Sequence, residues 1–376
     1  MKKKGLLFIL FIMFSFALTG CWDNHEMEDR SYVITLGVDK YSGEESSRYT
    51  LSLGSAQLSA LSKNDDNKEA IPTVFADGKT LSSAVKKADC QSSREMYLGQ
   101  LKTVVFGKEL LEDKTLLTSV LDELERNQDI SEKIILLGTD GEAADCVAAI
   151  LQEDSSTGMF LWDFYKNTSD NVAVTRRLNL ESFLMELRNS EGCSVLPKIS
   201  MKDKKIRLGG GIALADYQLC GVLNDDEERG SLYIKGEAKG DVVEGKWENT
   251  VVPVWVYRNK VKTTFSEQDG RLVCHILSKS QGSVEGSDFL EGHLLDSHTI
   301  KVLEKEFEEI IKRRMEDTIK LSQQQYGEDV FDFASDLRRK NYGLYNKYGE
   351  NRQNMIKNMI FDVQADLQIR TTGVIQ

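Results

Sequence analysis

The stretch Ile300–Lys320, IKVLEKEFEEIIKRRMEDTIK, is the clearest helix in the sequence. Its apolar residues recur every three or four positions and form one stripe, and glutamates precede lysine or arginine by four residues elsewhere on its surface. The stripe consists of Ile300, Leu303, Phe307, Ile310, Ile311, Met315, Thr318 and Ile319. We therefore predict one long amphipathic helix over residues 297–326 that buries this stripe against a sheet.

The end of the chain supplies a strand for that sheet. In Phe361–Arg370, FDVQADLQIR, apolar and polar residues alternate, as in a strand with one buried face. We predict this closing strand over residues 359–370. Residues 31–200 mix strand and helix patterns. Together these patterns predict an α+β, multi-domain fold of mixed sheets with helices, in which the long C-terminal helix packs on an antiparallel-rich sheet.

A change in composition suggests how the chain divides. The polar, basic run Lys198–Lys205 separates an N-terminal α/β domain, residues 31–200 and open to subdivision, from one or more C-terminal α+β domains, residues 205–376. The C-terminal part is strand-rich over residues 206–290. Strands are predicted at 206–214, 217–223, 232–236, 251–265 and 271–277, with a hairpin turn at Asp269-Gly270 and a solvated hairpin tip at Asn224–Arg229.

The charge balance limits the partners. The chain of 376 residues has 48 Lys and Arg against 60 Asp and Glu, a net charge of −12. Removing the first twenty residues removes three lysines and leaves −15. Because a chain this acidic repels the phosphate backbone of nucleic acids, we expect no nucleic-acid partner. Anionic lipid headgroups would repel it as well, and attachment to a membrane would need another force.

The N-terminus supplies that force. A basic start, Met1–Lys4, precedes an apolar run, Leu6–Leu18, that is too short to span a bilayer as a helix. This pattern is typical of an export signal. Leu18-Thr19-Gly20-Cys21 matches the lipobox of bacterial lipoproteins, in which small residues admit the peptidase and the cysteine thiol takes a diacylglyceryl group. We predict a lipoprotein signal peptide over 1–20, lipid attachment at Cys21, and a tether over 21–30.

The remaining cysteines do not suggest a disulfide framework. They are Cys90, Cys146, Cys193, Cys220 and Cys274. Their number is odd and their spacing wide and irregular, so they cannot all pair within the chain. We predict buried free thiols that act as small apolar residues, although the sequence leaves their disulfide state open.

No motif predicts catalysis. Ser83 and Lys86 spell SxxK, but the companion SDN and KTG motifs are absent and a plain amphipathic helix explains them equally well. His293 and His298 are five residues apart, which does not suit a pair of helical metal ligands. Gly209–Gly211 has no phosphate-loop flanks and is predicted as a close approach or bulge in a strand. We predict no catalytic residue, cofactor or metal.

Several short motifs, in order along the chain, resemble one family. They are Gly20-Cys21-Trp22-Asp23, Gly37-Val38-Asp39-Lys40, Gly78-Lys79-Thr80-Leu81, Tyr97-Leu98-Gly99, Val104-Val105-Phe106-Gly107, Leu121–Asn127, Ser194-Val195-Leu196-Pro197, Gly211-Ile212-Ala213-Leu214, Tyr326-Gly327-Glu328-Asp329 and Arg370-Thr371-Thr372-Gly373. In this order they resemble the Ger(x)C family, the C-subunit lipoproteins of spore nutrient-germinant receptors. Two positions depart from the family pattern: Gln100 stands where histidine is common, and Asn341-Tyr342 follows a basic run where proline is usual.

The resemblance implies an exported, lipid-anchored subunit with three mixed α/β domains. Such a subunit acts with a transporter-like membrane subunit and a second membrane subunit on the outer face of the spore inner membrane. No catalytic residue carries over, and direct contact with the germinant stays open. We therefore predict a non-enzymatic lipoprotein subunit of a germinant receptor. The alternatives are a solute-binding lipoprotein of a transporter, which needs a cleft between two similar lobes, and a membrane-tethered serine hydrolase using Ser83 and Lys86.

Overall fold

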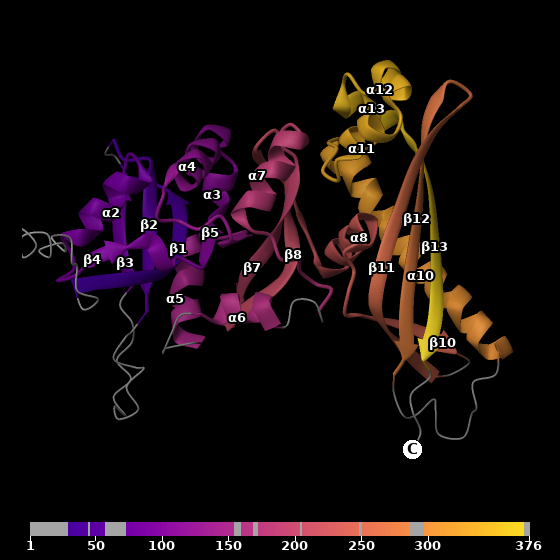
Figure 1. Ribbon diagram of the computed structural model, residues 1–376, viewed down its shortest axis with the longest axis horizontal. Helices are drawn as coiled ribbons and strands as arrows, with labels where there is room; N and C mark the ends of the chain where they lie inside the picture. Colours follow the sequence, from indigo (N-terminus) through magenta and orange to yellow (C-terminus); the bar gives the residue numbers. More distant parts are fainter. Residues whose placement is uncertain are drawn as a thin grey trace, which may run out of the picture.

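The computed structural model describes residues 29–43, 46–56, 73–153, 159–167, 172–203, 205–247, 250–285 and 297–371. Two separate sheets follow one another along the molecule, a nine-stranded sheet in the N-terminal half and a four-stranded sheet in the C-terminal half (Figure 1). The fold is α+β with mixed sheets, as predicted. Within the described residues, no helix combines the length and the apolar character that a transmembrane span requires.

The first sheet is mixed and has the order β3-β2-β1-β5-β6-β7-β8-β9, with the short β4 paired to β1. Its centre, from β1 through β5 and β6 to β7, is parallel, and both flanks are antiparallel. Its strands are β1 (Arg30–Lys40), β2 (Tyr49–Ser55), β3 (Thr73–Gly78), β4 (Glu95–Tyr97), β5 (Thr103–Phe106), β6 (Ile135–Gly138), β7 (Ser194–Lys202), β8 (Lys205–Ala215) and β9 (Gln218–Leu223).

Helices cover both faces of this sheet, because its central strands are apolar on both sides. Every residue of β5 (TVVF) and β6 (ILLG) is buried. One face packs on α2 (Leu81–Asp89), α3 (Lys108–Leu111), α4 (Lys114–Arg126) and α7 (Leu180–Asn189), and the other on α5 (Ala143–Glu153) and α6 (Phe160–Asn167). A short turn, η3 (Leu98–Gln100), follows β4. The two helical layers lie above and below the strands in Figure 1.

The second sheet has the order β10-β11-β12-β13. Its strands are β10 (Asp241–Trp247), β11 (Thr250–Gln268), β12 (Arg271–Val284) and β13 (Ile360–Thr371). The helices of this half are α8 (Asp225–Lys235), α10 (Ser297–Lys320), the π-helical η5 (Leu321–Tyr326), α11 (Phe333–Lys340), α12 (Tyr342–Tyr348) and α13 (Arg352–Asn358). The turn at Asp269-Gly270 joins β11 to β12 as predicted, and β13 runs parallel to β12.

The long helix packs on one face of this sheet, as its stripe predicts. Leu303, Phe307 and Ile311 of α10 are fully buried, and β11, β12 and β13 pass in front of α10 in Figure 1. The helical segment ends at Gly327, whose φ of 66° is left-handed. On its flank, α10 satisfies two backbone N–H groups of the edge strand β13. Leu367 N donates to Glu308 at 3.1 Å and Ile369 N donates to Glu304 at 2.9 Å.

The predicted hairpin tip at Asn224–Arg229 and the predicted strand at 232–236 are wrong, because both belong to α8. The Asn224 side chain accepts hydrogen bonds from the N–H groups of Asp226 and Glu227, and the Glu227 side chain accepts one from Asn224 N. This capping box starts a helix, and the acidic first turn complements the helix dipole. Gly236, with a φ of 75°, ends it.

The sheet does not end at the boundary predicted for Lys198–Lys205. These residues form the hairpin between β7 and β8, so a cut there would separate two paired strands. By its sheets the chain divides between Leu223, the end of β9, and Asp241, the start of β10. The close approach predicted at Gly209–Gly211 is confirmed, since Gly210 has a φ of 75° and a Cβ there would overlap the carbonyl oxygen of Leu223.

Candidate functional site

The predicted lipid-attachment residue, Cys21, lies outside the described residues. The five other cysteines are free thiols in the structure. Burial raises the pKa of Cys146 to about 11 and that of Cys193 to about 12, which makes both thiols unreactive at neutral pH. Cys90 is exposed and Cys220 is partly buried, so the prediction of buried thiols holds for three of the five.

Ser83 and Lys86 do not form a nucleophile and its base. The Ser83 hydroxyl belongs to the capping box of α2, donating to Thr80 O at 2.9 Å and accepting from Thr80 N at 3.1 Å. Lys86 Nζ lies 2.9 Å from an oxygen of Asp89 and 3.3 Å from one of Glu95, and these hydrogen bonds raise the pKa of Lys86. A lysine held in its protonated form cannot accept a proton from a serine.

The structure brings together a serine, a histidine and an aspartate that the sequence analysis missed. Ser266 Oγ is 2.8 Å from His275 Nε2, and His275 Nδ1 is 2.9 Å from Asp362 Oδ2. The three residues sit on neighbouring strands, β11, β12 and β13, so no short motif could reveal them. They lie on the face of the sheet away from α10, where the His275 and Asp362 side chains are 34% and 45% exposed.

The metal hypothesis of the sequence analysis concerned His293 and His298. His298 stands exposed in the first turn of α10, and His293 lies outside the described residues. No group of three or more His, Cys, Asp or Glu suited to a metal ion occurs among the described residues.

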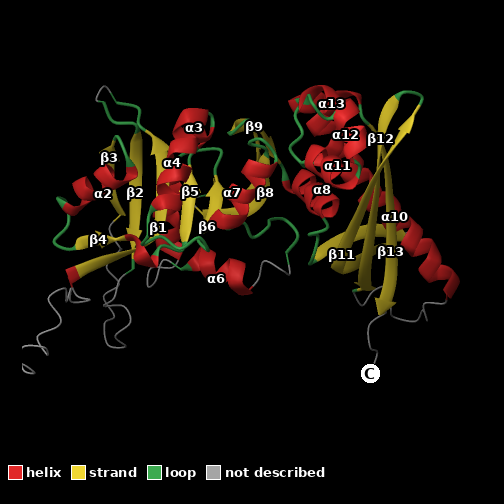
Figure 2. Ribbon diagram, turned by 45° about the horizontal axis from the view of Figure 1, so that its top comes forward, coloured by secondary structure: helices red, strands yellow, loops and turns green. Residues whose placement is uncertain are grey.

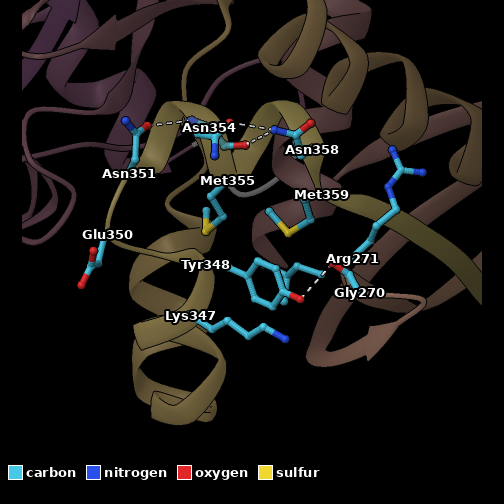
Figure 3. Close-up of a pocket in the computed structure, with 11 residues that line it drawn as sticks. Gly270, Arg271, Lys347, Tyr348, Glu350, Asn351, Asn354, Met355, Asn358 and Met359 are labelled. Carbon is cyan, nitrogen blue, oxygen red and sulfur yellow. Dashed lines mark hydrogen bonds between the residues drawn. The ribbon is translucent and has the colours of Figure 1, made fainter.

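A pocket of about 480 Å³ lies between the β11–β12 turn and helices α12 and α13 (Figure 3). The Tyr348 hydroxyl donates to Gly270 O at 3.0 Å and ties the two walls together. Asn354 and Asn358 form one polar edge and are hydrogen-bonded to each other at 2.8 Å. Polar amides, cations and two methionines line the pocket. This lining can bind polar groups, but it contains no pair of nucleophile and base. Nothing in the sequence pattern predicted it.

A buried cluster of charges lies where α8 meets strands β7 and β8 of the first sheet. Arg176 contacts Glu186 at 2.6 Å and Glu237 at 3.7 Å, and its side chain is only 5% exposed. Glu228 is fully buried, and neither of its carboxylate oxygens has a hydrogen-bond partner among the described residues. Burial raises the pKa of Glu228 to about 8. A Cβ at Gly211 would lie 2.6 Å from Glu228 Oε2, so only glycine gives this carboxyl group its room.

A second set of contacts joins the two halves of the molecule at the end of α7. The carbonyl oxygen of Asn189 accepts hydrogen bonds from Ser335 Oγ at 2.8 Å and from Arg352 at 3.1 Å. Arg352 also binds Asp332 at 3.0 Å. A cation at a helix C-terminus is favourable, and here it comes from α13 in the other half of the chain. Specific polar contacts therefore help to hold the two halves of the molecule together.

Comparison with known proteins identifies the family. Residues 23–201 match the model for the spore germination protein N-terminal domain, and residues 209–373 match the model for the spore germination B3/GerAC-like C-terminal domain. The chain belongs to the Ger(x)C family. It is 22% identical to spore germination protein KC of Bacillus subtilis, over 100% of this chain and 97% of that protein, and 21% identical to spore germination protein B3, over 92% of each.

A solved structure shares the fold of this Ger(x)C chain. The crystal structure of the GerBC protein aligns with a TM-score of 0.56 and 16% identity, covering 92% of this chain and 99% of that one. The two family models meet between residues 201 and 209, near the boundary that the sequence analysis placed, although the hydrogen-bonded sheet continues to Leu223.

The Ger(x)C motifs near the N-terminus have a structural role. The Asp39 carboxylate accepts hydrogen bonds from Ala143 N at 2.8 Å and Ala144 N at 3.0 Å, and so caps α5. Gly107 leaves room for that carboxylate, because a Cβ there would overlap it. The family residues Asp39 and Gly107 therefore position α5 at the carboxyl ends of the parallel strands β1 and β5.

Proposed function

We propose that this chain is a lipid-anchored, non-enzymatic subunit of a nutrient germinant receptor. The observation that carries the proposal is that two spore-germination domain models cover residues 23–201 and 209–373, the first starting two residues after Cys21 of the predicted lipobox. Its partners are a transporter-like membrane subunit and a second membrane subunit, on the outer face of the spore inner membrane. Acyl chains confine the chain to the bilayer, where high effective concentration lets modest interfaces hold such an assembly.

Two features support a role in assembly, one over catalysis and the other over solute binding. Ser83 and Lys86 are engaged in a helix cap and in ion pairs, and the Ser266–His275–Asp362 row lies on an open sheet face. The two halves of the chain have different sheets, which does not favour a two-lobed solute-binding protein.

Replacing the lipobox cysteine tests this function. Cys21→Ala should release the protein from membranes, because each methylene of an acyl chain buried in the bilayer contributes about 0.8 kcal/mol to membrane binding. The variant should also impair nutrient germination, while its thermal melt stays unchanged. The matched control is Cys90→Ala, which removes an exposed thiol outside the lipobox. The measurements are membrane fractionation, mass spectrometry of the N-terminal peptide, and germination on defined nutrients. Full membrane retention of Cys21→Ala, or normal germination without this gene, would contradict the proposal.

A further inference from the structure

One face of the four-stranded sheet consists mostly of exposed or half-buried residues. We call it the outer face; it is the side away from α10. Val254, Cys274 and Val363 belong to the core cluster that includes the stripe of α10, so they define the inner face. Residues paired directly across strands share a face, and their neighbours along a strand point the other way. Trp255, paired with Val242, therefore lies on the outer face. Figures 1 and 2 show α10 along one side of the four-stranded sheet.

A row of cations runs along the outer face. Arg258, Lys260 and Lys262 occupy alternate positions of β11, spaced about 6.7 Å apart as strand geometry requires, and all three are exposed. None of the three has an ion-pair partner among the described residues. Lys279 of β12 is paired with Lys260 across the ladder and has one counterion, Asp366 of β13 at 3.8 Å. A surface pocket of about 300 Å³ forms among these side chains, lined by Arg258, Lys260, Lys279, Ser280, Gln281, Asp366 and Gln368.

Apolar and aromatic side chains continue this row toward β10. Val242 is 45% exposed and Val251 is 55% exposed, and both stand on the outer face. Trp255 and Tyr257 are half-buried there and contact each other edge to face, with ring centroids 6.1 Å apart. Tryptophan and tyrosine beside lysine and arginine are the residues that proteins place at the level of lipid headgroups.

We propose that the outer face docks on the anionic surface of a lipid bilayer, with phosphate groups held by Arg258, Lys260, Lys262 and Lys279. The net charge of −15 without the leader does not prevent this, because salt screens charges beyond about 8 Å and the local row decides the contact. The nine residues from Trp22 to Arg30 span at most about 30 Å, so anchoring at Cys21 keeps the start of β1 within that distance of the bilayer.

This docking surface rests on the proposal that the chain works at a membrane, and a lipid-free chain separates the two. The mature chain from Trp22, without leader or lipid, is mixed with phosphatidylcholine vesicles and with vesicles containing about one third phosphatidylglycerol, and co-sedimentation is measured. We expect a clear preference for the anionic vesicles that weakens with salt. If the lipid-free chain shows no preference for anionic vesicles, the docking proposal fails, but the outcome of the Cys21 experiment is unaffected.

Matched variants locate the binding. Lys260→Gln with Lys262→Gln should lower the affinity for anionic vesicles about 25-fold, roughly fivefold for each lysine. Lys301→Gln with Lys305→Gln removes two exposed lysines of α10 and should change the affinity less than twofold. Thermal melts confirm that each variant folds. An equal loss in both variants, or no loss in the first, would overturn the proposal.

Other occupants give distinct results. If the chain shows no preference between neutral and anionic vesicles, and inorganic phosphate at constant ionic strength releases it from both, the cations bind free phosphate. That result would overturn lipid docking. Absence of vesicle binding, together with weaker association of the Lys260→Gln, Lys262→Gln variant with the membrane subunits in detergent, would make the outer face a protein interface. Preference for anionic vesicles that only this variant loses supports lipid docking.

Discussion

The two sheets of this protein differ in how much of their surface is available to a partner. The nine-stranded sheet has helices on both faces, and its central strands β5 and β6 are buried at every residue. The four-stranded sheet has α10 on one face only, and its strands alternate between buried and exposed residues. Continuous apolar strands require two covering layers, whereas alternating strands need one. Among the described strands, those of the C-terminal sheet therefore present an exposed face, whereas the central strands of the N-terminal sheet do not.

The largest expected effect tests whether the two sheets are stable independently. Phe307 of α10 is fully buried against the C-terminal sheet, so Phe307→Asp would bury an unpaired charge and cost more than about 4 kcal/mol. Hydrogen exchange should show loss of protection in β10–β13 while β5 and β6 stay protected. Lys305→Asp, on the exposed side of α10, is the control and should melt normally. Loss of protection in both sheets would show that they form one cooperative unit.

The contact between the sheets should respond to pH through Glu228. Burial raises its pKa to about 8, above the ordinary value near 4.5, with Arg176 and Lys235 opposing and Glu186 and Glu237 adding to the shift. The folded state therefore keeps the proton that the unfolded state releases, and the stability that this group contributes at pH 4 is lost as the pH rises toward 8.

Glu228→Gln removes this titration. We expect the variant to be more stable than the native chain at pH 8 by roughly 4 kcal/mol and to differ little from it at pH 4.5. Thermal melts across this range measure the difference. The exposed neighbour Asp226→Asn provides the control on the same helix. A parallel pH dependence of the Glu228 variant and the native chain would show that Glu228 is charged in the folded state.

In the nine-stranded sheet, a smaller effect is expected from the cap of α5. Asp39→Ala removes the acceptor for Ala143 N and Ala144 N and should cost about 1 to 2 kcal/mol of unfolding free energy. Asp39→Asn keeps one acceptor and should cost less. Chemical denaturation monitors both variants. Equal losses for the two would indicate that the charge of Asp39, and not its hydrogen bonding, holds α5.

The smallest effect is expected at Ser83, in the first turn of α2. Ser83→Ala removes half of the capping box of α2 and should cost about 0.5 to 1 kcal/mol. The native chain should also stay unlabelled by a fluorophosphonate, which phosphonylates activated serines. Labelling at Ser83 that Ser83→Ala abolishes would revive the hydrolase alternative.

Sequence periodicity predicted the elements that bury a regular pattern. The stripe of Leu303, Phe307 and Ile311 gave the helix over residues 297–326, and the alternation of Phe361–Arg370 gave the closing strand. The same reasoning failed for α8, because its short apolar run at 232–236 resembles a strand and the capping pattern of Asn224 and Glu227 was overlooked. The polar run at Lys198–Lys205 suggested a linker, but it is the exposed end of a hairpin.

The sequence alone determined the family motifs and the amphipathic helix of the second half, since each depends on residues close together in the chain. It also predicts the export signal and its lipobox cysteine, for the same reason. Only the tertiary structure decided which distant residues meet. Glu228 faces Gly211 across the contact between the two halves, and Lys260 stands beside Lys279 on a shared face. Strand order and register set these neighbours, and neither is encoded in any local pattern.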